Sequence, residues 1–266
     1  MSDILLIGYG AIGQYVASAL EQYAHSRVSH VLCRQGRQGA VAQAMGSRIP
    51  CIYDPAELPD NIDLVVECAG HSAVSQYFPA LLEAGKDILS VSGGALADAD
   101  LEQRLTRSAL VGDSRLTLLS GAIGSLDALS AASVGGLESV TYRGRKPPQG
   151  WRGSAAEQQL DLDSLQMPVK FFEGTARQAA LSFPKNANVA AAVAMAGIGF
   201  DGTRVELIAD PSMNANRHEV EAVGEFGQLN FSIEGKPLPG NPRSSALTAM
   251  SVVRQIHRRN SPLSTA

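Results

Sequence analysis

The sequence contains few cysteines, few charged residues and no long run of either charge sign. Its three cysteines, Cys33, Cys51 and Cys68, are spread over the first quarter of the 266 residues without C-x-x-C spacing. That arrangement offers neither a zinc motif nor a disulfide framework, and it is typical of a reducing compartment. We therefore expect a cytoplasmic protein without a metal site.

Charged residues make up only 18% of the chain, the formal net charge is −4, and the one basic run is the short "HRRN" near the C-terminus. A nucleic acid or a membrane surface is consequently not expected as a partner. No apolar stretch is long enough to span a membrane, and no basic segment of a secretory leader precedes the first short apolar run. The expected ligand is a small molecule.

The first half of the chain alternates short apolar runs with helical patterns. Strands are indicated by "DILLIG", "RVSHVLC", "IDLVVECAG" and "KDILSVSGG", and helices between them by "AIGQYVASALEQYA" and "SAVSQYFPALLEAG". Uninterrupted apolar strands divided by helices require a parallel sheet that is covered on both faces. The pattern predicts a doubly wound α/β domain over residues 1–115.

After Gly121 the pattern changes to short strands, "LESVTYRG", "TRVELIAD", "RHEVEAVG" and "GQLNFSIEG", which favour a mostly antiparallel sheet. The alanine-rich "TARQAALSF" and "NANVAAAVAMAG" indicate closely packed helices. We expect a second, α+β domain over residues 116–240, which binds substrate and forms the dimer. The helical "SSALTAMSVVRQIHRR" follows a proline-rich segment, and we expect residues 241–266 to complete the first domain.

A glycine fingerprint lies between the first strand and the first helix, where Gly8, Gly10 and Gly13 have G-x-G-x-x-G spacing. The first glycine allows a tight turn, the second lets backbone amides approach a pyrophosphate, and the third permits close helix–strand packing. The motif predicts a Rossmann-type dinucleotide site. We expect contacts to the cofactor from Gly8, Gly10, Ala11, Ile12 and Gly13.

The second strand ends in Cys33-Arg34, where an NAD-specific site has Asp or Glu. A guanidinium can accept the 2′-phosphate of NADP, so NADP or dual use is favoured over strict NAD use. The alternative is that Arg34 is a solvated residue that stacks on adenine. The strand end "ECAG" points to the same crevice, where Cys68, Ala69 and Gly70 offer small side chains and free backbone to the nicotinamide ribose.

Two segments of the second half are candidates for binding an anionic substrate. "LLSGAIGSLDAL" ends a strand and begins a helix at Gly124 or Ser125, so its free amides suit a carboxylate. In "FPKNANVAAAVAMAG", Asn186 or Asn188 is expected to cap a helix and Lys185 to add a cation; capping alone and surface solvation are the alternatives. The substrate-binding residues predicted here are Gly121, Ile123, Gly124, Ser125 and Lys185.

A histidine occurs within the strand pattern "NANRHEVEA", where alternation places His218 on the apolar side with Val220 and Ala222. The segment lacks the second histidine of H-E-x-x-H, which argues against zinc. Two possibilities remain from the residues alone, a packed core histidine and an acid/base catalyst.

Taken together, "GYGAIG", "ECAG", "SGAIGSLDAL", "FPKNANVAAAVA", "ADPSMNANRHEVEAVGEFG" and "GNPRSSALTAMS" resemble the L-aspartate dehydrogenase family, in order and over nearly the whole chain. The last four are more specific than the glycine fingerprint. The resemblance implies a Rossmann domain followed by an α+β domain. It also implies oxidation of L-aspartate with NAD or NADP to iminoaspartate, which hydrolyses to oxaloacetate and ammonia or feeds quinolinate synthesis in pyridine nucleotide biosynthesis.

The resemblance also implies roles for individual residues. The family's active-site histidine falls on His218 in the N-x-H-E motif, and its cofactor contacts fall on Ala122 and Asn188. The segment "NPRSS" departs from the expected N-P-K-T-S, although Arg243 keeps the charge and Ser244 the hydroxyl. In the implied mechanism one base, His218, takes the amine proton during hydride transfer and then activates the water that attacks the imine.

Two other functions fit the sequence less well. One is a related two-domain NAD(P)-dependent reductase or dehydrogenase of another small acid, and the other is a non-catalytic NAD(P)-binding sensor. An exposed edge of the antiparallel sheet favours a homodimer.

Overall fold

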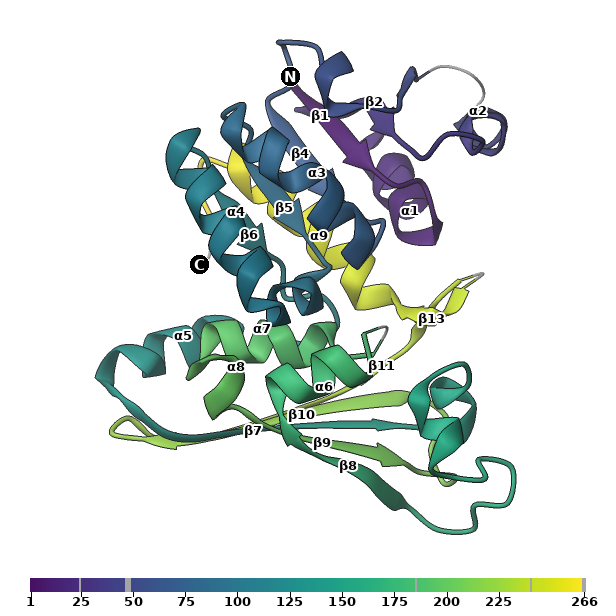
Figure 1. Cartoon of the computed structure of the whole chain (residues 1–266), viewed down its shortest axis with the longest axis vertical. Coiled ribbons are helices and arrows are strands. Elements are labelled where there is room, and N and C mark those ends of the chain that lie inside the picture. Colours follow the sequence, from purple (N-terminus) through teal and green to yellow (C-terminus); the bar gives the residue numbers. More distant parts are fainter. Residues whose placement is uncertain (24, 46–48, 185, 240, 265–266) are drawn as a thin grey trace. The chain divides into compact units, whose positions relative to one another are not determined.

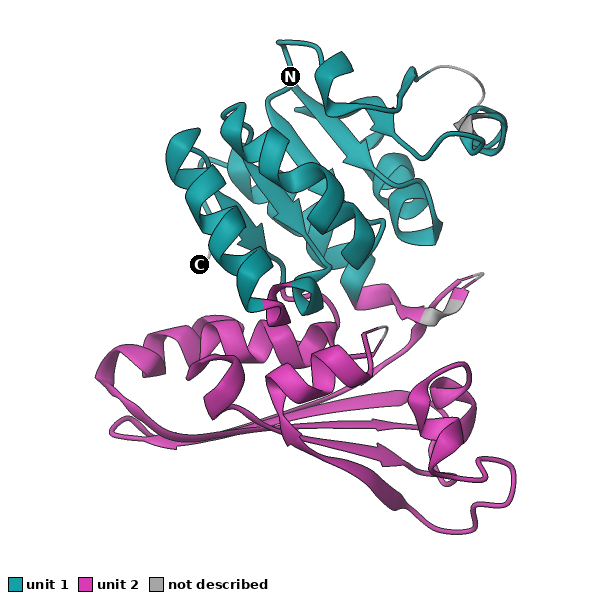
Figure 2. Cartoon of the chain, viewed as in Figure 1, with its two compact units in different colours: residues 1–95, 99–119, 248–266 teal, residues 96–98, 120–247 magenta. Residues whose placement is uncertain are grey.

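The computed structural model describes residues 1–23, 25–45, 49–184, 186–239 and 241–264. The chain forms two compact units, which Figure 2 shows in different colours. Unit 1 consists of residues 1–95, 99–119 and 248–266, and unit 2 of residues 96–98 and 120–247. The predicted boundaries differ from these at three places. Residues 96–98 belong to unit 2, residues 116–119 belong to unit 1, and the chain returns to unit 1 at residue 248 instead of 241.

Unit 1 contains a parallel sheet with the strand order β3-β2-β1-β4-β5-β6. The order reverses next to β1, as in doubly wound dinucleotide-binding folds, so the predicted architecture is confirmed. Its strands are β1 (Ser2–Ile7), β2 (Ser26–Leu32), β3 (Cys51–Ile52), β4 (Leu64–Glu67), β5 (Ile88–Ser90) and β6 (Leu116–Leu118).

Helices cover both faces of this sheet. Figure 1 shows α3 (His71–Glu83) and α4 (Ala99–Val111) on the near face and α9 (Ala246–Asn260) on the far face. The remaining helices of the unit are α1 (Ala11–Leu20), α2 (Gln38–Met45) and the short 3₁₀ turns η1 (Pro55–Glu57) and η2 (Gly93–Ala97).

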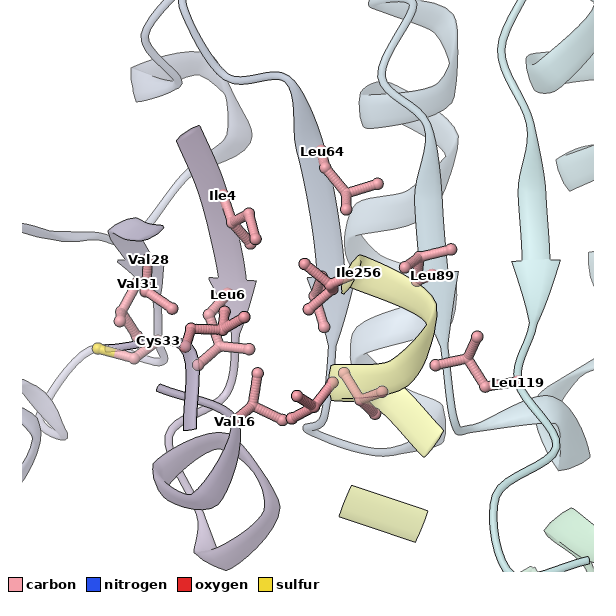
Figure 3. Packing of buried hydrophobic residues seen from close by; sticks show 14 of the residues in the cluster. Ile4, Leu6, Val16, Val28, Val31, Cys33, Leu64, Leu89, Leu119 and Ile256 are labelled. Carbon is pink, nitrogen blue, oxygen red and sulfur yellow. The ribbon is translucent and has the colours of Figure 1, made fainter. Parts of the chain in front are cut away.

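The core of unit 1 shows why the last helix belongs to it. Val16 of α1 and Ile256 of α9 pack with the strand residues Ile4, Leu64 and Leu89 in one buried cluster (Figure 3). Each such aliphatic side chain contributes about 1.5–3 kcal/mol when it is fully removed from water. The C-terminal helix is therefore part of the core of the first unit, as the sequence predicted.

Unit 2 contains a sheet with the strand order β11-β10-β7-β9-β8. The pair β7–β9 is parallel and the other pairs are antiparallel, so the sheet is mixed and mostly antiparallel. Its strands are β7 (Leu137–Lys146), β8 (Val169–Thr175), β9 (Arg204–Ala209), β10 (Asn216–Gly224) and β11 (Gly227–Gly235), and a small hairpin of β12 (Pro237–Leu238) and β13 (Asn241–Ser245) follows.

Helices lie on one face of this sheet, as Figure 1 shows for α5 (Leu126–Gly135), α6 (Ala176–Ser182), α7 (Asn188–Ala196) and α8 (Gly199–Gly202). Alternate residues of β7 and β10 are buried beneath them, as expected for strands with one covered face. The 3₁₀ turns η3 (Pro148–Trp151) and η4 (Ala155–Gln158) follow β7, and Trp151 is fully buried. In the described segments no helix is both long enough and apolar enough to cross a membrane.

Candidate active site

The glycine loop of unit 1 has the geometry that its spacing predicts. Gly8 has a φ of 87°, and a Cβ there would lie 2.7 Å from Cβ of Ala69. A Cβ at Gly13 would lie 2.4 Å from the carbonyl oxygen of Gly8, which explains the close approach of α1 to the loop. At Gly10 a Cβ would meet no atom within 4 Å, so the loop leaves open space beside the N-terminus of α1. That space fits an anion such as a pyrophosphate.

A cavity in unit 1 begins at this loop. Its lining includes five residues that the sequence predicts to bind the cofactor, namely Gly8, Gly10, Arg34, Cys68 and Ala69. It also includes Arg37, which follows Arg34 by one turn, with the Arg37 amide bonded to the Arg34 carbonyl oxygen at 3.1 Å. Arg37 was not predicted, although the segment "RQGR" carries both arginines. The two exposed guanidinium groups give the cavity a positive side.

The loop between β4 and α3 is held by a buried carboxylate, Glu67. Its Oε1 accepts hydrogen bonds from the amides of Ala69 at 2.6 Å and Gly70 at 2.7 Å, and also from the Ser92 hydroxyl at 2.9 Å. The other oxygen accepts from the Ser90 hydroxyl at 2.6 Å. Glu67 is completely buried, so these bonds replace water and fix the backbone of the predicted ribose contacts.

In unit 2, the predicted carboxylate-binding turn immediately precedes α5. The helix begins at Leu126 with Ser125 as its N-cap, one residue from the expected start. Ser125 has a left-handed φ of 63°, and its hydroxyl is buried without a hydrogen-bond partner among the described residues. Gly124 lies against the Phe231 ring, where a Cβ would be 2.8 Å from Cζ. Phe231 pairs with Val220, two residues from His218, so the turn and the histidine share one face of the sheet.

The predicted asparagine cap of α7 is wrong. The N-cap position is Ala187, and Asn188 is the first helical residue. The side chain of Asn186 points to another partner, because its Oδ1 accepts a hydrogen bond from Nζ of Lys146 at 2.8 Å. Lys185 and the side chain of Arg243 lie outside the described residues.

His218 is buried in β10 with 4% of its surface exposed, on the apolar face as predicted. Its Nδ1 is hydrogen-bonded to the hydroxyl of Tyr142 at 2.8 Å. Among the described residues Nε2 has no such partner, so one ring nitrogen is oriented and the other is available to a ligand. The Tyr142 hydroxyl can donate to Nδ1 or accept from it, and the second arrangement leaves Nε2 as a proton acceptor.

The charge state of His218 follows from its surroundings. Burial, and then the nearby positive charge of Lys146, lower the pKa of His218 from 6.5 to about 3. The imidazole is therefore neutral at pH 7, the form that can accept a proton. Burial also raises the pKa of the Tyr142 phenol, so Tyr142 stays a neutral hydroxyl.

The glycine opposite His218 in the sheet makes this contact possible. Gly144 of β7 pairs with His218, and a Cβ at Gly144 would lie 2.8 Å from the Tyr142 hydroxyl oxygen. A larger residue would displace the phenol from Nδ1. No group of three or more His, Cys, Asp and Glu residues that could hold a metal ion occurs in the part of the chain that the structure describes.

Removal of the Tyr142 hydroxyl tests whether that group orients the histidine. We expect Tyr142→Phe to lower kcat about 10-fold, because loss of a buried hydrogen bond of about 1–2 kcal/mol frees the ring to adopt unproductive orientations. The dissociation constant of NADPH, measured by fluorescence titration, should not change. A kcat equal to that of the unmodified protein would show that Tyr142 only packs against the ring.

Comparison with known proteins covers both units. The family described as "Aspartate dehydrogenase, C-terminal" matches residues 127–259, and "Homoserine dehydrogenase, NAD binding domain" matches residues 8–118. An L-aspartate dehydrogenase of Ruegeria pomeroyi is 52% identical over 98% of this chain and 93% of the relative. One of Pseudomonas aeruginosa is 46% identical over 96% of this chain and 97% of the relative.

Among solved structures, aspartate dehydrogenase from Thermotoga maritima superimposes with a TM-score of 0.79 at 27% identity, and the match covers 100% of both chains. A hyperthermophilic archaeal homoserine dehydrogenase in complex with NADPH has a TM-score of 0.61 at 12% identity over 99% of each chain, which shows a shared fold.

Proposed function

We propose, because the chain belongs to the L-aspartate dehydrogenase family, that it oxidises L-aspartate with NAD or NADP to iminoaspartate, which hydrolyses to oxaloacetate and ammonia or passes to quinolinate synthesis. The observation that carries this proposal is the 52% identity to an L-aspartate dehydrogenase over 98% of the chain, since it spans both units. The predicted family, fold class and oxidoreductase activity are confirmed at this level.

The nucleotide loop fits the cofactor. Open space at Gly10 and the N-terminus of α1 suit a pyrophosphate, and Glu67 holds the Ala69–Gly70 backbone for a ribose. The cofactor supplies a nicotinamide C4 that accepts a hydride. The further contacts expected from Ala11, Ile12, Ala122 and Asn188 remain predictions.

His218 is the proposed base. Its Nε2 accepts the proton that the substrate amine loses as the C=N bond forms, while Tyr142 holds Nδ1. Once that proton has passed to solvent, the same nitrogen can accept a proton from the water that attacks the imine. The turn from Gly121 to Ser125 is proposed to hold a substrate carboxylate through amides other than that of Ile123, which donates to the Ser120 carbonyl oxygen at 3.2 Å. The unpartnered Ser125 hydroxyl is a donor in that turn.

Arg34 and Arg37 are proposed to hold the 2′-phosphate of NADP. We expect Arg34→Asp to raise KM for NADP at least about 10-fold and to change KM for NAD far less, because the new carboxylate repels the phosphate and removes a charge-assisted hydrogen bond. Steady-state kinetics with both cofactors measures the ratio. Arg104→Asp is the matched control, since Arg104 lies on α4 and bonds the Ser75 carbonyl oxygen at 2.6 Å. Equal losses for NAD and NADP would exclude the phosphate contact.

A substrate screen tests the proposed activity. The purified protein is incubated with NAD or NADP and with L-aspartate, L-glutamate, L-alanine or L-homoserine, and the absorbance of the reduced nicotinamide is followed. We expect turnover with L-aspartate to exceed turnover with the others. Preference for another acid would establish the related dehydrogenase instead, and cofactor binding without any turnover would establish the sensor.

We also propose a cytoplasmic homodimer. The three free cysteines support a reducing compartment. The face of the unit 2 sheet opposite the helices carries ion pairs such as Arg143–Glu206 at 2.9 Å and Arg143–Glu221 at 3.0 Å, a polar surface that a second copy can cover. Light scattering coupled to size exclusion should give twice the mass of the chain; the monomer mass would rule the dimer out.

A further inference from the structure

Lys146, the last residue of β7, is a buried cation that forms no ion pair with any described carboxylate. Only 9% of the residue is exposed, and in the described part of the chain no carboxylate lies within ion-pair distance of its Nζ. The partners of Nζ are Oδ1 of Asn186 at 2.8 Å and the ring of Trp151, whose centre is 4.8 Å away. Neither group neutralises the ammonium. Burial lowers the pKa of Lys146 from 10.5 to about 8, so the side chain still carries its charge at pH 7.

The neighbouring cations of β7 form ion pairs, unlike Lys146. Arg145, the residue before Lys146, pairs with Asp210 at 2.9 Å, and Arg143 pairs with two carboxylates. These arginines are on the face opposite the helices. A buried and unpaired ammonium costs stability, whereas a paired one recovers part of that cost. The one lysine on the covered face of β7 therefore calls for a functional reason.

Lys146 lies beside His218. On the covered face of β7 it is the next residue after Gly144, which pairs with His218. Gly144 itself has no side chain, and the Tyr142 hydroxyl that lies over it is bound to Nδ1 of His218, which leaves Nε2 without a partner among the described residues. The positive charge of Lys146 adds to the effect of burial in lowering the pKa of His218, as expected for two neighbouring side chains. A small ligand that reaches Nε2 of His218 is therefore within the field of the ammonium.

We propose that Lys146 binds one carboxylate of the substrate next to His218. The inference rests on the proposed function and extends it, because it names a residue that selects for an anionic amino acid. An ammonium has three donors, and Asn186 uses one of them. A substrate carboxylate supplies the missing counter-charge, and Asn186 and Trp151 hold the ammonium in place before the substrate arrives.

The test uses Lys146→Met, which keeps the length and apolar stem of the side chain and removes its charge. We expect KM for L-aspartate to rise about 10- to 100-fold, as for loss of a hydrogen bond between charged groups, with the KM for the cofactor unchanged. The Tm should stay equal or rise, because a buried charge is removed. Lys170→Met is the matched control, since Lys170 lies on β8 of the same sheet in an ion pair with Glu206.

A binding measurement separates this inference from the proposed activity. Succinate, a dicarboxylate that lacks an amine to oxidise, is titrated calorimetrically into the protein saturated with NADP. We expect Lys146→Met to weaken succinate binding at least about 10-fold and Lys146→Arg to retain most of it, because Arg keeps the charge. Lys170→Met should bind succinate like the unmodified protein.

The outcomes decide between the two claims. The protein could oxidise L-aspartate while Lys146→Met changes neither the KM for L-aspartate nor the binding of succinate. That result would overturn the role of Lys146 and leave the proposed function intact. Succinate binding that depends on Lys146, in a protein that does not oxidise L-aspartate, would keep the carboxylate site and refute the proposed function. Loss of the fold in Lys146→Met would show that Lys146 serves structure, and it would also overturn the inference.

Discussion

Replacement of His218 by Ala is expected to lower kcat by about 10²- to 10⁴-fold, the usual contribution of a positioned acid/base. The affinity for NADPH should be unchanged, because the nucleotide cavity is lined by residues of unit 1 alone and His218 belongs to unit 2. Pre-steady-state and steady-state rates with L-aspartate, combined with a fluorescence titration of NADPH, measure the two effects. His257→Ala serves as the control, because His257 lies on α9 of unit 1 against Tyr23.

The double variant gives a sharper result. If Tyr142 acts through His218, Tyr142→Phe should cost little more once His218 is absent, so the two effects on kcat are not additive. Additive losses would mean that Tyr142 has a separate role. A kcat of His218→Ala within about threefold of that of the unmodified protein would show that the histidine is a packed core residue, since general acid–base catalysis contributes far more than that.

The second large effect is expected at Gly8. In Gly8→Ala the residue must keep a φ of 87°, which costs an L-residue about 1–2 kcal/mol, and its Cβ must lie 2.7 Å from that of Ala69. Ala69 cannot easily move away, because its amide is bound to the buried Glu67 at 2.6 Å. Strain and overpacking together should lower the free energy of unfolding by about 2–5 kcal/mol and weaken NADPH binding.

Gly10→Ala is the matched comparison within the same loop. Its Cβ meets no atom within 4 Å and its φ is −81°, so denaturant unfolding should give the same free energy as for the unmodified protein. NADPH binding should nevertheless weaken, because the added methyl group occupies space that the pyrophosphate needs. Undiminished NADPH affinity in Gly10→Ala would mean that the pyrophosphate does not approach this loop.

Local patterns predicted much of this molecule. The alternation of apolar runs and helices predicted the parallel sheet, and the spacing of Gly8, Gly10 and Gly13 predicted a loop whose contacts the structure shows. Alternation along β10 likewise placed His218 on the covered face. Each of these features depends on residues close together in the sequence, for which periodicity is informative.

Features that depend on distant contacts were missed. The parallel pair β7–β9 joins strands that β8 and the helices α6, α7 and α8 separate in the sequence, so no local pattern marks it. Asn186 suggested a helix cap from its position, but the buried Lys146 attracts its side chain. Only the folded chain brings these two residues together.

Lys146 was not among the site residues predicted from the sequence. The alternation that identified His218 also runs through "VTYRGRK" and places Lys146 on the same face as Val140, Tyr142 and Gly144. A lysine at the end of a strand ordinarily reaches water, so the pattern alone did not mark it. Its burial becomes evident only when Trp151 and Asn186 are seen to enclose it.

The proposed reaction interconverts L-aspartate and oxaloacetate with a nicotinamide cofactor. The most direct measurement supplies the purified protein with oxaloacetate, ammonia and NADPH or NADH, and it follows both loss of the reduced cofactor and formation of L-aspartate by chiral chromatography. We expect L-aspartate in amounts equal to the cofactor consumed, and no consumption of cofactor when ammonia is omitted. Cofactor consumption without ammonia, or a product other than L-aspartate, would contradict it.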